Sequence, residues 1–146
     1  MKVQVEIDAT CKETEVVIRT NELTHEVNEI VQKLATAHQK FLAGFTDEGV
    51  QLIDIREIIR IYSADKKIFA ETISGEFIIR MRLYEMEERL DKMLFARISH
   101  SEIVNLKAIQ KMDLSLTGTI AMTLSNQKVV YVSRRYVTKI KQLLGI

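Results

Sequence analysis

Short runs of β-branched and aromatic residues recur from Lys40 onwards, and they limit the fold of this chain more than any other feature. Gly, Asn, Asp and Ser separate the runs and supply the turns, because the chain contains no proline. Regular short strands with tight turns are typical of a compact antiparallel β domain. The expected strands cover residues 40–44, 49–53, 57–62, 67–73, 76–82, 107–113, 118–124 and 127–132.

Two helices are expected within this β-rich region. Apolar residues at helical spacing predict one helix over 83–94 and a second at the C-terminus, with Ser133 as its N-cap and Gly145 just after its last turn. The fold class is therefore α+β, mostly β. The two apolar stripes consist of Leu83, Met86, Leu90 and Leu94, and of Val137, Ile140, Leu143 and Leu144.

Residues 1–39 form an N-terminal extension with a different pattern. Alternating apolar and polar residues predict a strand over 2–8, a second strand over Glu15–Arg19, and a helix from an N-cap at Asn21 to about residue 37. This unit is too small to hold a core alone, so we expect it to pack against the rest or to pair with a copy of itself. The domain organisation is thus 1–39 and 40–146, and the chain shows no internal sequence repeat.

Composition and motifs argue against an enzyme. Hydrophobic residues make up 47% and charged residues 28%, the balance of a globular protein, and the single Cys11 suits a reducing cytoplasmic setting. The chain contains no nucleotide-binding, nucleophile or metalloprotease motif. The histidines His25, His38 and His100 do not have metal-ligand spacing. We therefore expect no catalytic residue, no metal and no cofactor.

Charge is distributed unevenly along the chain. Residues 1–54 carry 5 Lys or Arg against 10 Asp or Glu, whereas residues 97–146 carry 8 against 2. This gradient predicts a polyanionic partner for the C-terminal third. The alternative is that the fold mixes the charges in space and removes the gradient.

The start of the last helix carries an unusual pair of cations. Arg134 and Arg135 follow the N-cap Ser133, where positive charge opposes the helix macrodipole at a cost of about 0.3–1 kcal/mol each. Guanidinium groups beside free helix N–H groups form an anion-binding site, and Arg also binds guanine edges through two hydrogen bonds. The alternative is two solvated arginines with salt-bridge partners elsewhere.

Two further segments offer donors to nucleic acid. The segment 97–102 contains Arg97, Ser99, His100 and Ser101, which suit phosphates and base edges. The loop 63–67 ends in Lys66 and Lys67, which could contact phosphates, although loop lysines often serve solubility alone.

Four segments in this order resemble the LytTR DNA-binding domain family, over about residues 40–146. RISHSEIVN at 97–105 resembles the R-x-S-x-S-x-x-V-N signature of that family, and SRRY at 133–136 resembles the start of its last helix. Upstream, IIRIYSADK at 58–66 resembles its strand and loop, and YEMEERL at 84–90 resembles its helix. The chain departs from the family pattern at Tyr62–Ser63, where an acidic residue is common, and in a short first loop.

The resemblance implies a β-rich domain that inserts loops, rather than a recognition helix, into successive major grooves of duplex DNA. Carried over by position, the base-reading residues are Lys66, Lys67, His100 and Arg135, and Asn105 is expected to be structural. The residues expected to contact the DNA backbone are Arg97, Ser99, Ser101, Ser133, Arg134, Tyr136 and Lys139.

The expected function is that of a bacterial-type, cytoplasmic transcriptional regulator that binds promoter DNA, as a homodimer on repeated half-sites. Because too few residues precede the domain for a phosphoacceptor receiver, it resembles the small stand-alone regulators of this family, which are often controlled by a membrane-bound partner protein. The alternative is a protein- or ligand-binding regulatory module that does not bind DNA. Binding to RNA is less favoured, because only 6% of the residues are aromatic.

Overall fold

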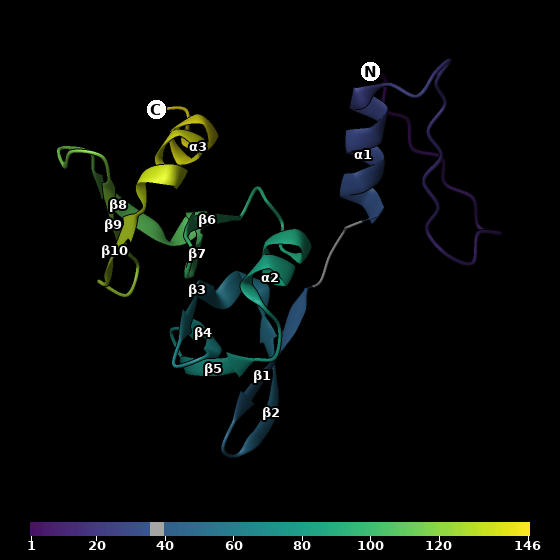
Figure 1. The fold of residues 1–146 in the computed structure, drawn as a ribbon. Coiled ribbons are helices and arrows are strands. Elements are labelled where there is room, and N and C mark those ends of the chain that lie inside the picture. Colours follow the sequence, from purple (N-terminus) through teal and green to yellow (C-terminus); the bar gives the residue numbers. More distant parts are fainter. Residues whose placement is uncertain (36–39) are drawn as a thin grey trace. The chain divides into compact units, whose positions relative to one another are not determined.

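The computed structural model describes residues 1–35 and 40–146, which belong to two compact units, Met1–Ala35 and Thr36–Ile146. Figure 1 shows the helix α1 (His25–Ala35) in the first unit and the β-rich second unit. The predicted helix end near residue 37 and the predicted role of His38 lie outside the described residues.

The two strands predicted in the N-terminal unit are wrong. Residues 2–8 and 15–19 form no strand, and Val3, Val5 and Ile7 are 78%, 82% and 97% exposed. Alternation supplies an apolar face, but a strand also needs a neighbouring backbone to complete its hydrogen bonds, and this unit provides none. The helix also begins later than predicted, after Thr24, whose hydroxyl accepts a hydrogen bond from the N–H of Val27 at 3.2 Å.

The second unit contains two antiparallel sheets, which confirms the α+β, mostly β fold class. A seven-stranded sheet has the order β2-β1-β5-β4-β3-β7-β6, and a three-stranded sheet has the order β10-β9-β8. The strands are β1 (Phe41–Thr46), β2 (Gly49–Asp54), β3 (Ile58–Ala64), β4 (Lys67–Thr72), β5 (Gly75–Ile79), β6 (Phe95–Ser99), β7 (Glu102–Asn105), β8 (Ile109–Asp113), β9 (Ile120–Leu124) and β10 (Val129–Val132). The helices are α2 (Leu83–Arg89) and α3 (Arg134–Leu144), with 3-10 turns η1 (Ile55–Glu57) and η2 (Leu106–Ala108).

Two elements differ from the expectation in a way that matters for the site. Strands β6 and β7 occupy a segment that we expected to present loop donors. Helix α2 is shorter than the predicted 83–94, because the backbone of Leu90 is extended. The N–H groups of Leu94 and Phe95 then bond to the carbonyl of Asp91 in a turn that leads into β6.

Two apolar cores hold the second unit together, one under α2 and one under α3. Met86 of α2 is fully buried against the seven-stranded sheet, and Ile140 of α3 is fully buried between β6 and the small sheet. In Figure 1, β6 and β7 lie between α2 on one side and the small sheet with α3 on the other. These two strands therefore join the two cores.

A buried charge network also ties the two sheets together. The Nε of Arg60 lies 2.9 Å from the Oε2 of Glu71, and its Nη1 lies 3.3 Å from the Oε2 of Glu102. From the β9–β10 turn, the Nζ of Lys128 lies 3.1 Å from Glu71, and the side chain of Asn126 also donates to Glu71. Burial raises the pKa of Glu102, and the positive charge of Arg60 offsets this rise only in part.

Candidate nucleic-acid interface

Two hairpin turns lie side by side at one end of the strands of the seven-stranded sheet. Asp65 and Lys66 form the β3–β4 turn with φ of 50° and 62°, the left-handed geometry of a tight hairpin. His100 and Ser101 form the β6–β7 turn. The N–H of Ser63 donates to the carbonyl of Ser101 at 2.8 Å, so a backbone hydrogen bond connects the turn that carries His100 to the strand end that leads into Lys66.

The start of α3, which belongs to the second core, lies beside the end of β6. The N–H of Ser133 donates to the carbonyl of Ile98 at 2.8 Å, two residues before His100. Arg135, in the first turn of α3, is exposed, as are Lys66 and His100. Strand pairing therefore brings the turns that carry Lys66 and His100 together, and the hydrogen bond from Ser133 places the start of α3, which carries Arg135, beside the end of β6.

A groove of about 950 Å³ lies beside these turns. Its lining includes Lys66 and Lys67 from the first hairpin, and Arg97, His100 and Ser101 from the second. The lining also contains two arginines that the sequence reasoning missed, Arg80 and Arg82, which follow β5. Their signal was the basic run R-M-R directly before the α2 stripe. We call the exposed set Lys66, Lys67, Arg80, Arg82, His100 and Arg135 the basic edge.

The other end of the sheet has the opposite character. Strand β1 runs antiparallel to β5, so the β1–β2 turn lies at the end away from Arg80. That turn contains Asp47 and Glu48, both exposed. The basic edge and the acidic β1–β2 turn thus lie at opposite ends of β5.

Arg97 has a different environment from the one expected for a phosphate contact. Its side chain is only 10% exposed, and its Nη1 lies 2.9 Å from the Oε2 of Glu87 on α2. Its Nε donates to the carbonyl of Ser99 at 2.8 Å, and its Nη2 donates to the carbonyl of His100. These bonds engage the guanidinium and hold the β6–β7 turn in place.

Of the predicted serine contacts, Ser99 and Ser101 bond to each other, whereas the side chain of Ser133 has no such partner within the described residues. The N–H of Ser101 donates to the hydroxyl of Ser99 at 3.2 Å, which orders the turn. Ser133 occupies the N-cap position of α3, as predicted, but its side chain makes no cap hydrogen bond. Its Oγ is buried and has no hydrogen-bond partner within the described part of the chain.

The remaining predicted contacts lie on or near α3. Arg134 packs over the β8–β9 loop, because a Cβ placed on Gly118 would lie 3.0 Å from its Nε. Tyr136 is partly buried against the core under α3, whereas Lys139 is exposed. Gly145 ends the helix in the left-handed conformation, with φ of 70°, as the sequence predicted.

Two other features are absent from residues 1–35 and 40–146. No group of three or more His, Cys, Asp or Glu in these ranges is placed to hold a metal ion. Within the same ranges, no helix has the length and apolar character needed to cross a membrane.

Comparison with known proteins gives a consistent result. Residues 48–145 match the LytTr DNA-binding domain family. An "Uncharacterized HTH-type transcriptional regulator" of Staphylococcus aureus strain NCTC 8325 is 33% identical over 147 residues, which cover 100% of this chain and 99% of the relative. A protein of the same description from strain MSSA476 is 35% identical over 151 residues, with the same coverage. A solved LytTr DNA-binding domain from Bacillus cereus has a TM-score of 0.72 at 24% identity, over 75% of this chain and 100% of that chain.

Proposed function

This chain belongs to the LytTr DNA-binding domain family and is a DNA-binding transcriptional regulator, and we propose that it reads duplex DNA through its basic edge. In this proposal the β3–β4 turn, the β6–β7 turn and the start of α3 enter major grooves. Lys66, His100 and Arg135 contact base edges there, because Arg and Lys bind the guanine O6 and N7 atoms. The chemistry is binding, and no catalytic step is needed.

The observation that carries the proposal is the hydrogen-bonded placement of the three elements at one edge. The bonds from Ser63 to Ser101 and from Ser133 to Ile98 fix their relative positions through the backbone. A preformed, exposed cationic surface can bind duplex DNA with little loss of conformational entropy. The name of the relatives mentions a helix-turn-helix, but in this chain five strands, β6 to β10, separate α2 from α3. Reading by turns therefore suits this domain better than reading by a helix pair.

The contacts with phosphates follow from the same edge. Lys139 and Arg134 on α3 and Ser101 in the β6–β7 turn flank the proposed base-reading residues. Neutralised phosphates release counterions, so affinity should fall linearly with salt on logarithmic axes. Arg97, Ser99, Ser133 and Tyr136 belong to this proposal as residues that hold the surface in place.

Selection of bound duplexes from a random pool at two salt concentrations tests the proposal. We expect a repeated sequence motif to be enriched. On that motif, Arg135→Ala should cost about 1–3 kcal/mol and relax the preference at one position, whereas Lys139→Ala should weaken all duplexes alike and reduce the salt slope by about 1. Arg89→Ala, at the exposed C-terminal end of α2, is a matched control that should change neither. A pool with no enrichment would instead favour the non-DNA regulatory module.

The N-terminal unit is the proposed contact between two copies on repeated half-sites. Leu23, Val31 and Leu34 are 79%, 45% and 46% exposed, and the last two lie on one face of α1. In a cytoplasmic protein, a second copy of this chain would cover these exposed apolar residues. A membrane-bound regulatory partner would be the other occupant of the same residues. Sedimentation of the full chain should show a dimer that Leu34→Lys weakens. A wild-type protein that remains monomeric at high concentration would contradict self-association.

A further inference from the structure

Two consecutive stretches of the β domain repeat one order of elements. Residues 41–89, which we call repeat 1, contain a hairpin (β1–β2), the turn η1, a three-stranded meander (β3–β4–β5) and α2. Residues 95–144, repeat 2, contain a hairpin (β6–β7), the turn η2, a meander (β8–β9–β10) and α3. The domain therefore contains a structural repeat, which the sequence pattern did not predict.

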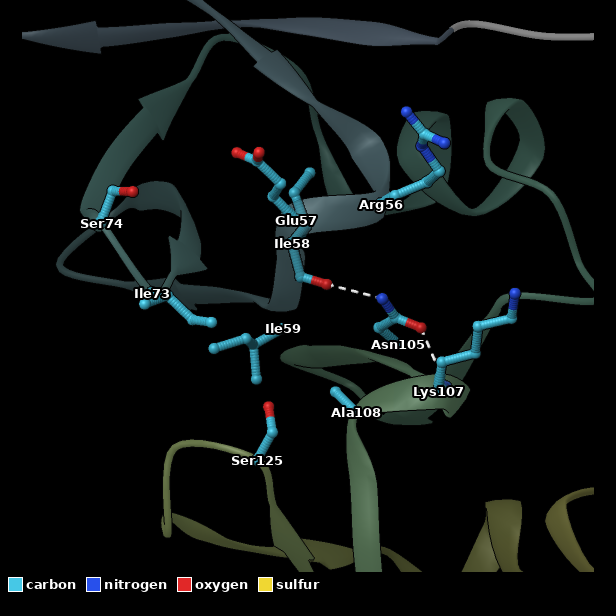
Figure 2. Close-up of a pocket in the computed structure, with 10 residues that line it drawn as sticks. All are labelled: Arg56, Glu57, Ile58, Ile59, Ile73, Ser74, Asn105, Lys107, Ala108 and Ser125. Atoms are coloured by element: carbon cyan, nitrogen blue, oxygen red, sulfur yellow. Dashed lines mark hydrogen bonds between the residues drawn. The ribbon is translucent and has the colours of Figure 1, made fainter.

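The two 3-10 turns, η1 in repeat 1 and η2 in repeat 2, are capped by equivalent hydrogen bonds. In repeat 1, the Oδ1 of Asp54 accepts from the N–H of Arg56 at 2.9 Å, and in repeat 2 the Oδ1 of Asn105 accepts from the N–H of Lys107 at 2.9 Å. Figure 2 shows the two turns facing each other across a pocket of about 470 Å³, with Asn105 bonded to Lys107 and to the carbonyl of Ile58. The two capping residues are thus structural counterparts.

The strands on either side of the two 3-10 turns also have equivalent hydrogen bonds and register in the two repeats. The N–H of Ile55 donates to the carbonyl of Lys40, the residue before β1, and the N–H of Leu106 donates to the carbonyl of Leu94, the residue before β6. The meanders share a register shift after their first residue, between Ile58 and Arg60 and between Ile109 and Lys111. The segments DIREIIR at 54–60 and NLKAIQK at 105–111 carry similar residues at the cap, at the first two turn positions and on both sides of the shift, and differ at the last turn position and at the shifted residue.

The junction between the meander and the helix in repeat 1 corresponds to the same junction in repeat 2. In repeat 2, β10 leads through Ser133 into Arg134 and Arg135 of α3. In repeat 1, β5 leads through Arg80 and Arg82 into α2. Both junctions therefore carry two arginines around the start of the helix, before it in repeat 1, where Arg82 is the N-cap, and in its first turn in repeat 2, after the N-cap Ser133.

The surroundings of Arg80 and Arg82 suit an anion. Both side chains are exposed, and neither takes part in the ion pairs found within residues 1–35 and 40–146. The guanidinium of Arg80 stacks 3.9 Å above the ring of Phe45, which fixes its position without neutralising it. Both line the groove that Lys66 and His100 also line, and the carboxylate of Glu85 there accepts a hydrogen bond from the N–H of Arg82.

We propose that Arg80 and Arg82 bind backbone phosphates of the DNA, as the repeat 1 counterpart of the arginines at the start of α3. The two junctions would then clamp the duplex on both sides of the turns that carry Lys66 and His100. This inference rests on the proposed function, because it names further contacts of the same DNA surface. Repeat 1 would contribute the β3–β4 turn and this junction, and repeat 2 the β6–β7 turn and the start of α3.

The test compares the salt dependence of DNA binding by the full chain and by Arg80→Gln/Arg82→Gln, on a selected duplex and on a random duplex. Each phosphate contact adds about 0.9 to the logarithmic salt slope. The double variant should therefore lose about 1.8 of that slope. Over a four-fold rise in salt, the wild type should lose about 12-fold more affinity than the variant. The loss at low salt should be equal on both duplexes.

Two comparisons make the result specific. Arg56→Gln/Arg89→Gln removes the same charge from exposed positions away from the groove and should keep the wild-type slope. Arg82→Gln alone, which leaves the Arg80–Phe45 stack intact, should lose about 0.9 of the slope even where the double variant unfolds. An unchanged slope in Arg82→Gln and in the folded double variant would overturn this inference and leave the proposed function standing. A wild type that binds no duplex would overturn the proposed function itself.

Discussion

Replacing Asn105 by Ala should destabilise the β domain far more than replacing its counterpart Asp54. Asn105 is 5% exposed, and its Nδ2 donates to the carbonyl of Ile58 at 2.8 Å while its Oδ1 caps η2. Two lost hydrogen bonds cost about 1 kcal/mol each, and the orphaned carbonyl of the fully buried Ile58 adds about 1 kcal/mol or more. We therefore expect a loss of about 3 kcal/mol in the free energy of unfolding.

Asp54→Ala is the matched control, because it removes the same cap from η1. The carboxylate of Asp54 is 25% exposed, and among the described residues it bonds to Arg56 alone. Water can therefore replace the lost carboxylate, and the expected cost is about 1 kcal/mol. Thermal unfolding followed by circular dichroism should show Tm falling by roughly 12 °C for Asn105→Ala and roughly 4 °C for Asp54→Ala. Equal shifts would refute the claim that the bond from Asn105 to Ile58 joins the two repeats.

Three further outcomes follow from packing and protonation. Gly44→Ala should cost about 1–3 kcal/mol in urea unfolding, because the new Cβ would lie 2.8 Å from a β5 side chain. Burial raises the pKa of Glu102 above 4.5, so the protonated side chain stabilises the folded state fully below pH 4.5, and this stabilisation is lost as pH rises through the folded-state pKa. Unfolding measured at a series of pH values should show that Glu102→Gln removes this pH-dependent loss of stability. Burial and the hydrogen bond to Glu76 raise the pKa of Tyr62 to about 12, and Glu76→Gln should shift that phenolate transition to lower pH in an absorbance titration.

The periodic part of the fold could be predicted from the sequence, because alternation and helical spacing are local signals. Strands β6 and β7 were missed since their apolar residues, such as Ile98 and Ile103, are interrupted by polar residues that suit DNA contacts equally well. The prediction of two N-terminal strands was wrong for the opposite reason. Their alternation is clear, but whether a strand forms depends on a partner that local sequence does not specify.

The candidate site was predicted in part for a similar reason. The charge gradient predicts a polyanion-binding surface in the C-terminal third. Residues 55–96 carry equal numbers of cations and anions, yet they supply Lys66, Lys67, Arg80 and Arg82 of the basic edge. In the C-terminal third, Lys128 is paired with Glu71, so it adds no free cation. Which cations are neutralised depends on strand register and on contacts between elements distant in sequence.

Arg97 shows how a motif residue can affect DNA binding without touching DNA. The sequence predicts that Arg97 contacts the DNA backbone, but its guanidinium bonds to the carboxylate of Glu87 and to the carbonyls of Ser99 and His100. We therefore expect Arg97→Met to loosen the β6–β7 turn, weaken binding to the selected duplex and relax the preference at the position that His100 reads. The logarithmic salt slope should stay at the wild-type value, because no phosphate contact is lost. Glu87→Gln, which removes one of the three partners, should cause a smaller change in the same direction. A slope reduced by about 0.9 in Arg97→Met would instead show that Arg97 binds a phosphate directly, and that the turn is held by other bonds.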